Sequence, residues 1–139
     1  MLTIFLLHIL GYDIWFYLSH RLLHTPLLWP YHALHHAYRH PTFAETYAGH
    51  ALEGPFQSIG FLLPYVWFDP NIAAAAAAAV LVNVRGMMRH DARAIWLIGN
   101  HHLLHHEVGT KNFGEFWIDS LCGTAIDDAT RVKKGWIRV

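Results

Sequence analysis

The chain has 139 residues, of which 54% are hydrophobic and 14% aromatic, while only 14% are charged and the formal net charge is zero. Its length allows a single domain, residues 1–139, and its charged fraction lies well below the roughly 25% of soluble domains, which favours a membrane protein. No basic run interleaved with aromatic residues indicates a nucleic-acid surface, and a single cysteine, Cys122, excludes an internal disulfide and a cysteine-based zinc site.

The first predicted element is an apolar helix over residues 2–18, which at about 1.5 Å per residue would just cross a membrane. We do not interpret it as a signal peptide, since no basic segment precedes it and no small-residue cleavage site follows. Asp13 lies two helical turns before His20, so it either holds a ligand imidazole in place or lies near the membrane interface. His8, deeper in this helix, is expected to pack or hydrogen-bond within the bundle.

The first helix is predicted to run into a histidine pair, His20 and His24, and to end at Thr25-Pro26, because proline disfavours helix in the residue before it. A second helix is predicted from residue 27 to residue 39. It carries the second histidine cluster, formed by His32, His35 and His36.

Two further apolar segments, residues 51–68 and 72–88, are separated by the turn signal Asp69-Pro70-Asn71. We expect a helical hairpin whose arms approach the roughly 20 residues that a span requires. The hairpin and the first helix then give about three spanning helices, and the fold class is an all-α integral membrane helical bundle. Most basic residues fall on the histidine side, so the positive-inside rule predicts a cytoplasmic, His-rich helical cap.

The third histidine cluster, within residues 98–107, precedes a polar tail and contains His101, His102, His105 and His106. Residues three and four apart share one face of a helix, so each cluster is able to present several imidazoles together. A lone histidine would be an ordinary polar residue, but the chain has thirteen. Neutral imidazole binds iron, zinc and copper, and eight or nine of them exceed the needs of one zinc ion, which indicates two metal ions.

The three clusters have the spacings H-x3-H, H-x2-HH and H-x2-HH, in that order, at His20/His24, His32/His35/His36 and His102/His105/His106. In order and spacing they resemble the fatty acid hydroxylase and sterol desaturase superfamily, over residues 12–124. The segments that look most like its sterol C-5 desaturase branch are Gly49 to Ser58, His90-Asp91 and Asn112-Phe113-Gly114.

Two features depart from this resemblance. Family members usually have additional membrane helices before the first motif, whereas this chain begins with the helix that leads into it. The family's Trp-Asp pair is also shifted, since Asp119 follows Ile118 and the tryptophan is Trp117.

The resemblance implies an oxidoreductase: a membrane-bound non-haem di-iron enzyme that uses O2 and external electrons to desaturate or hydroxylate a C–H bond of a lipid, either a sterol or a fatty acyl chain. The implied cofactors are two iron ions, with O2 as co-substrate. The implied partners are the lipid and an electron donor such as cytochrome b5 or a ferredoxin with its reductase. The implied location is the endoplasmic reticulum or the bacterial inner membrane.

The motifs predict nine metal ligands, and two further histidines form a second tier that either binds metal or supports a ligand. The nine are His20, His24, His32, His35, His36, His90, His102, His105 and His106, and the second tier is His50 and His101. Asp91, Glu53 and Asn112 are candidates for orienting the imidazoles.

Two other functions use the same residue types. A zinc-dependent membrane hydrolase would bind zinc through the histidines and activate water, but no His-Glu-x-x-His motif supplies a general base. A metal carrier or channel would place histidines along a path through the membrane, whereas these clusters gather at the ends of the predicted spans.

Overall fold

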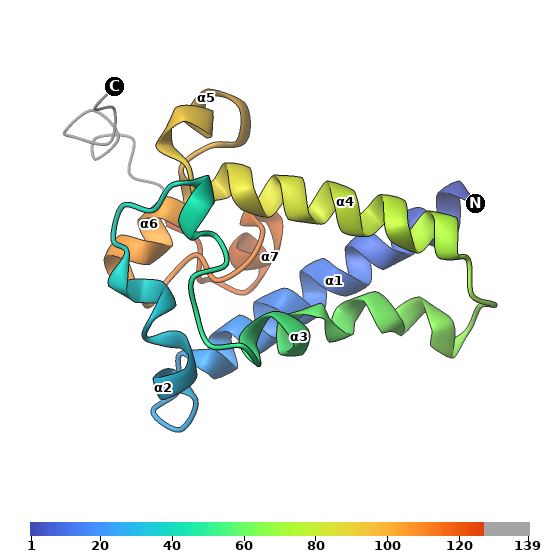
Figure 1. The fold of residues 1–139 in the computed structure, drawn as a ribbon, viewed down its shortest axis with the longest axis horizontal. Helices are drawn as coiled ribbons and strands as arrows, with labels where there is room; N and C mark the ends of the chain where they lie inside the picture. The colour runs from blue at the N-terminus through green and yellow to red at the C-terminus, as the bar shows by residue number, and fades with distance from the viewer. Residues whose placement is uncertain (127–139) are drawn as a thin grey trace.

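The computed structural model describes residues 1–126, and the secondary structure within that range is entirely helical, as the sequence predicts. Two long helices, α1 (Leu2–Leu23) and α4 (Ile72–Arg89), pack along each other. Figure 1 shows a third, shorter arm beside α1 and a group of short helices at one end of the bundle. The N-terminus and the turn before α4 lie at the opposite end.

Helix α1 is apolar outside and polar inside. Leu6, Leu10 and Leu18, spaced by four and eight residues, are 43–53% exposed and form a stripe on the outer face. His8 and Asp13 are buried on the inner face. A soluble protein would reverse this pattern, so the outer stripe is suited to lipid.

Asn71 caps the N-terminus of α4, since its side-chain oxygen accepts a hydrogen bond from the Ala74 backbone N–H at 2.9 Å. Ala74, Ala78 and Val82 are buried, one turn apart, and let α4 approach its neighbours closely. At about 33 Å and 27 Å, α1 and α4 match the roughly 30 Å hydrocarbon layer. Both are long and apolar enough to span it, and only 28% of the apolar window of α1 and 22% of that of α4 are buried within the protein.

The third arm is not one continuous helix. Residues 51–68, predicted as a span, form α3 (Glu53–Ser58) and then the 3₁₀ helix η3 (Ile59–Val66). Gly60 packs directly on Gly11 of α1, since a Cβ on Gly60 would lie 2.5 Å from the Gly11 carbonyl oxygen. Within the described residues only α1 and α4 therefore reach the length of a span, so the prediction of about three spans is wrong for this arm. As predicted, η3 and α4 are joined by a turn and run in opposite directions, and both pack on α1 (Figure 1).

Ion pairs join the two long helices to the C-terminal segment. Arg85 of α4 donates hydrogen bonds to Asp13 of α1, with an Nη1–Oδ2 distance of 3.2 Å, and its Nη1 lies 3.0 Å from Glu115 Oε1. Arg89 also pairs with Glu115. Asp13 therefore fixes α4 against α1, and its predicted alternative role, holding a ligand imidazole, is wrong.

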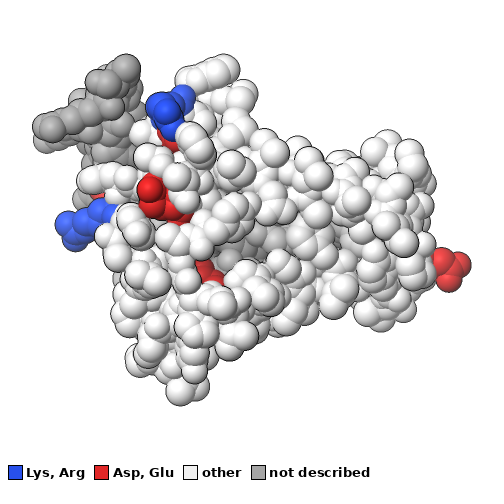
Figure 2. All heavy atoms as spheres, in the orientation of Figure 1, with Lys and Arg blue, Asp and Glu red and all other residues white. Residues whose placement is uncertain are grey.

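The short helices cap the bundle at the end opposite the N-terminus (Figure 1). In chain order they are α2 (Trp29–His32), η1 (His35–Ala37), η2 (Phe43–Glu45), η4 (Ala92–Ala94), α5 (Ile95–Ile98), α6 (His101–Val108) and α7 (Phe116–Leu121). Figure 2 shows charged side chains mainly at this end, while the surface over the long helices is almost free of charge.

The single helix predicted over residues 27–39 is wrong, because the chain turns at residues 33–34 between α2 and η1. The interruption is slight, since Ala33 and Leu34 keep helical backbone angles. His32 and His36 belong to one histidine group and His35 to the other, and His102, His106 and His105 divide in the same way on the continuous helix α6, so the division follows from helical spacing rather than from the turn.

Candidate metal centre

Nine histidines gather in two groups at the capped end of the bundle. Within each group, one ligand atom from every member lies within 4.8 Å of the others. The five-histidine group consists of His20, His24, His32, His36 and His105. The four-histidine group consists of His35, His90, His102 and His106. These are the nine residues that the sequence predicts as ligands. They come from α1, α2, η1 and α6, and from His24 and His90, which directly follow α1 and α4.

The two groups share their supporting backbone. His35 and His36 are neighbours in the chain yet belong to different groups, and so do His105 and His106. The rings of His36 and His106, one from each group, stack with their centroids 4.8 Å apart. The groups are therefore adjacent, and two dipeptides each supply a histidine to both.

The ring nitrogens in each group are spaced as ligands of one ion would be. In the five-histidine group, Nε2–Nε2 distances are 3.0 Å for His20 and His32 and 3.1 Å for His36 and His105. In the four-histidine group, His90 Nε2 lies 3.0 Å from His102 Nε2. Two nitrogens at right angles around an ion, each about 2.1 Å from it, are about 3.0 Å apart. The observed spacings therefore match those of imidazoles that share one cation.

Five of the nine imidazoles are fixed through Nδ1, which leaves Nε2 free to bind a metal. Each Nδ1 lies within hydrogen-bond distance of an oxygen: His20 of Phe113 O at 2.5 Å, His32 of Glu53 Oε1 at 2.9 Å, His35 of Ala48 O at 3.0 Å, His90 of Gly86 O at 2.7 Å and His105 of Lys111 O at 2.7 Å. The four backbone carbonyl oxygens only accept hydrogen bonds, so Nδ1 carries the proton in His20, His35, His90 and His105. Burial raises the pKa of Glu53 to about 8, so either Glu53 or His32 Nδ1 carries the proton that they share. The prediction that Glu53 orients an imidazole agrees with its contact to His32.

Burial keeps these imidazoles neutral. Burial first, and then the neighbouring His35, lowers the pKa of His24 to about 4, and burial chiefly lowers the pKa of His36 and of His90 to about 3. Only the neutral ring has a lone pair for a metal. His106, also buried, has no hydrogen-bond partner at either ring nitrogen among residues 1–126, so a metal would satisfy a polar group that is otherwise unpaired.

The remaining candidates lie outside both groups. His50 is exposed, and its Nδ1 accepts a hydrogen bond from the Leu52 backbone N–H at 3.2 Å. His101 directs Nε2 to Asp119 Oδ2 at 3.0 Å, which is the supporting role left open by the sequence. Asp91 caps η4 and pairs with Arg93, so the prediction that it orients an imidazole is wrong.

Asn112, the third orienting candidate, hydrogen-bonds the backbone and no imidazole ring within the described residues. Its side-chain Nδ2 donates to the carbonyls of His101 and Ile126 at 3.0 and 2.9 Å. Its φ of 59° places it in the left-handed region, which asparagine tolerates better than most residues. Asn112 therefore fixes the loop after α6 rather than a ring.

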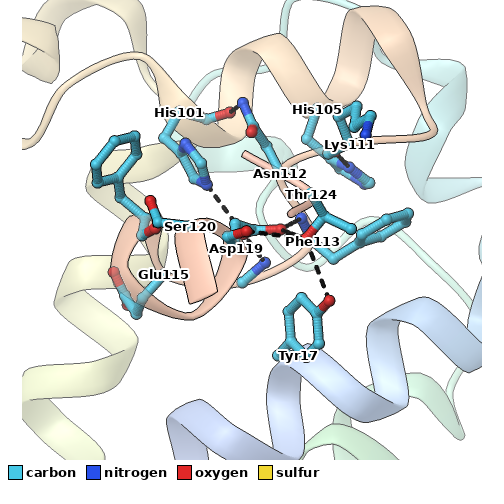
Figure 3. A network of polar contacts seen from close by, with 12 residues as sticks. Tyr17, His101, His105, Lys111, Asn112, Phe113, Glu115, Asp119, Ser120 and Thr124 are labelled. Atoms are coloured by element: carbon cyan, nitrogen blue, oxygen red, sulfur yellow. Dashed lines mark hydrogen bonds and ion pairs between the residues drawn. The ribbon is translucent and has the colours of Figure 1, made fainter. Parts of the chain in front are cut away.

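The supporting residue that the sequence did not identify is Asp119 of α7. Its carboxylate is fully buried and accepts hydrogen bonds from His101, Thr124 and two backbone N–H groups (Figure 3). Burial alone would raise the pKa of this carboxyl, but these donors hold it below its usual range. The available signal was an acidic residue shortly after Asn112-Phe113-Gly114, the segment that carries the family resemblance.

A cavity of about 110 Å³ lies between α1, α3 and α4 and reaches members of both histidine groups. The histidines that line it are His20, His35, His90 and His102. Phe16 and Phe61 line its apolar part, and Tyr47 and Asn83 contribute polar groups. A molecule in this cavity would lie beside any metal that the histidines hold.

A family model described as "Fatty acid hydroxylase" matches residues 5–124. Among curated proteins, Delta(7)-sterol 5(6)-desaturase ERG3A of Gibberella zeae is 34% identical over 131 residues, covering 86% of this chain and 37% of that protein. The Aspergillus fumigatus Delta(7)-sterol 5(6)-desaturase erg3C is 32% identical over 147 residues, covering 81% of this chain and 45% of that protein.

The chain thus spans less than half the length of these relatives. No solved structure matches it. With the match of a family model over nearly all the described residues, this chain belongs to the fatty acid hydroxylase family and is similar to its sterol desaturases.

Proposed function

We propose that this chain is the catalytic part of a membrane-bound non-haem di-iron enzyme that desaturates or hydroxylates a lipid, with the nine grouped histidines as ligands. The observation that carries the proposal is the convergence of these histidines into two adjacent groups with ligand spacing. The donor set fits the metal, because neutral imidazoles suit iron and two groups suit two ions.

When bound, the ions would supply the reduction of O2 that oxidation of an unactivated C–H bond requires. The overall balance needs two external electrons. Hydroxylation puts one oxygen atom into the lipid and releases the other as water, whereas desaturation removes two hydrogen atoms and releases both oxygens as water. An electron carrier such as cytochrome b5 or a ferredoxin is therefore a required partner in this proposal.

The chain's own residues position the reactants. The five fixed Nδ1 atoms hold the rings in one orientation, so that the metal ligands need not reorganise during turnover. Phe16 and Phe61 line the apolar part of the cavity, where the reacting carbon of the lipid would lie beside both groups. The similarity to sterol desaturases supports a sterol as substrate, and the apolar outer faces of α1 and α4 support delivery from the bilayer.

The test is mass spectrometry of lipids incubated with the purified protein, an electron donor and O2. We expect a lipid that either gains one oxygen atom or loses two hydrogen atoms, and only when both the donor and O2 are present. Equal conversion under argon would contradict the proposal and indicate hydrolysis, as in the zinc-dependent alternative. His36→Ala should lower conversion while the protein remains in the membrane.

A further inference from the structure

The loop that follows α6 holds two members of the five-histidine group. The carbonyl of Lys111 accepts the His105 Nδ1–H at 2.7 Å, and that of Phe113 accepts the His20 Nδ1–H at 2.5 Å. The loop is fixed at Asn112, whose side chain bonds the backbone of His101 and Ile126.

Asp119 organises this loop from α7. Its Oδ1 accepts hydrogen bonds from the Phe113 N–H at 2.9 Å and from Thr124 Oγ1 at 2.6 Å. Its Oδ2 accepts from the Gly114 N–H at 2.7 Å and from His101 Nε2 at 3.0 Å. Figure 3 shows these contacts converging on the carboxylate. Because Asp119 has no exposed surface, its carboxylate interacts with these donors and not with solvent.

One of these contacts has an electronic consequence. The Gly114 N–H and the Phe113 carbonyl belong to the same peptide group. A carboxylate that accepts from the N–H side polarises the group and makes its carbonyl oxygen a stronger acceptor. That oxygen receives the His20 Nδ1–H, so His20 Nε2 becomes a more basic ligand, as when a carboxylate contacts a ligand histidine directly.

The four-histidine group lacks an equivalent support among its described Nδ1 contacts. His35 and His90 donate to the carbonyls of Ala48 and Gly86, outside the loop that Asp119 fixes. The five-histidine group instead has acidic side chains behind two of its members: Glu53 contacts His32 directly, and Asp119 supports His20 through the Phe113–Gly114 peptide.

We propose that Asp119 is a positioning residue for one metal of the pair: through the Phe113–Gly114 peptide it orients and strengthens His20 as a ligand of the ion in the five-histidine group. This proposal rests on the two-metal centre proposed above. It makes the two ions inequivalent, the ion of the five-histidine group being the one that depends on Asp119.

The test is anaerobic titration of the metal-free chain in detergent with Co²⁺, followed by absorption and by metal analysis. We expect Asp119→Asn to weaken one of two Co²⁺ equivalents by about tenfold or more, the range for outer partners of metal ligands, and to leave the other unchanged. In the ⁵⁷Fe²⁺ protein, Mössbauer spectra should show one altered doublet of two. The matched control is Asp91→Asn, because the buried Asp91 also accepts from backbone N–H groups, those of Phe43 and Arg93.

A double-mutant cycle separates this role from general support of the fold. In a His20→Ala background, adding Asp119→Asn should change Co²⁺ affinity by less than about twofold, because the path through His20 is already lost. The proposal would be overturned if Asp119→Asn lowered Co²⁺ affinity equally with and without His20→Ala, lowered it equally at both ions, or left it unchanged. Failure of the unmutated protein to bind two ions would instead contradict the proposed function.

If Asp119→Asn does not fold, Gly114→Ala replaces it in the cycle. A Cβ on Gly114 would lie 3.0 Å from Tyr17 Cβ, so the substitution displaces the same peptide while keeping the carboxylate. The expected result is the same: a loss confined to one ion and absent in the His20→Ala background. A loss that persists in that background, or none, overturns the proposal.

Discussion

His35→Ala and His36→Ala should weaken the binding of different metal ions, although the two residues are adjacent in the chain. His35 belongs to the four-histidine group, where its Nε2 lies 3.1 Å from His90 Nε2. His36 belongs to the five-histidine group, where its Nε2 lies 3.1 Å from Nε2 of His32 and of His105.

The two losses should differ in size. His35→Ala reduces a group of four ligands to three, and His36→Ala reduces a group of five to four. Loss of a residue that hydrogen-bonds a metal ligand lowers metal affinity about 10–100-fold. Loss of a ligand itself from the smaller group should therefore lower metal affinity by at least about 100-fold. The loss for His36→Ala should be smaller, because four imidazoles still fill a complete coordination shell.

The assay is Co²⁺ titration of both single variants and of the double variant, with His50→Ala as the control outside both groups. We expect each single variant to bind one of the two Co²⁺ equivalents more weakly. The double variant should bind both more weakly, with nearly additive effects on the binding free energy. If the double variant loses no more Co²⁺ affinity than the single variant with the lower affinity, both residues bind one ion and the assignment to two groups is incorrect.

Three further predictions concern the support of the site. Glu53→Gln should weaken one metal equivalent by about 10–100-fold in the same titration, because the carboxylate that fixes His32 is lost; unchanged affinity would contradict this role. Gly60→Ala should lower stability by about 1–3 kcal/mol in thermal melts, because its Cβ would meet Gly11 of α1, whereas Gly54→Ala, with no atom within 4 Å of its Cβ, should not. Since the folded-state pKa of Asp119 is lowered, its stabilising effect should be present above its unfolded pKa of about 3.9 and disappear as the pH falls through the folded value. The melting temperature of the metal-free chain should therefore fall less with acid in Asp119→Asn than in the unmodified chain, and parallel curves would contradict this.

The sequence predicted the helical class and the set of histidines that come together, because both follow from local patterns. Apolar runs of about 20 residues indicate spans, and the repeated histidine spacings indicate metal ligands. The structure brings the nine predicted residues together and leaves His50 and His101 outside, which is the same division that the motifs gave.

The division of the ligands between two groups was not assigned from the sequence. In the structure the histidines spaced by four residues stay together, as His20 with His24, His32 with His36 and His102 with His106. Adjacent histidines, His35 and His36 or His105 and His106, point in directions about 100° apart on a helix and belong to different groups.

The supporting contacts were also largely hidden, because most use backbone carbonyls. Any residue provides a carbonyl, so the identities of Ala48, Gly86 and Lys111 carry no signal. Glu53 was recognisable as a nearby carboxylate. Asp119 acts through a peptide group of a loop, and only the folded chain brings that loop against α1.

The central claim is that one chain holds two metal ions through these nine histidines. Its most direct test is metal analysis of the detergent-purified chain after anaerobic loading with Fe²⁺ and removal of excess metal. The account predicts about two iron ions per chain, and about one ion when His90 and His102 are both replaced by alanine, because only the four-histidine group is disabled. One ion or none in the unmodified chain, or two ions retained in the double variant, would contradict it.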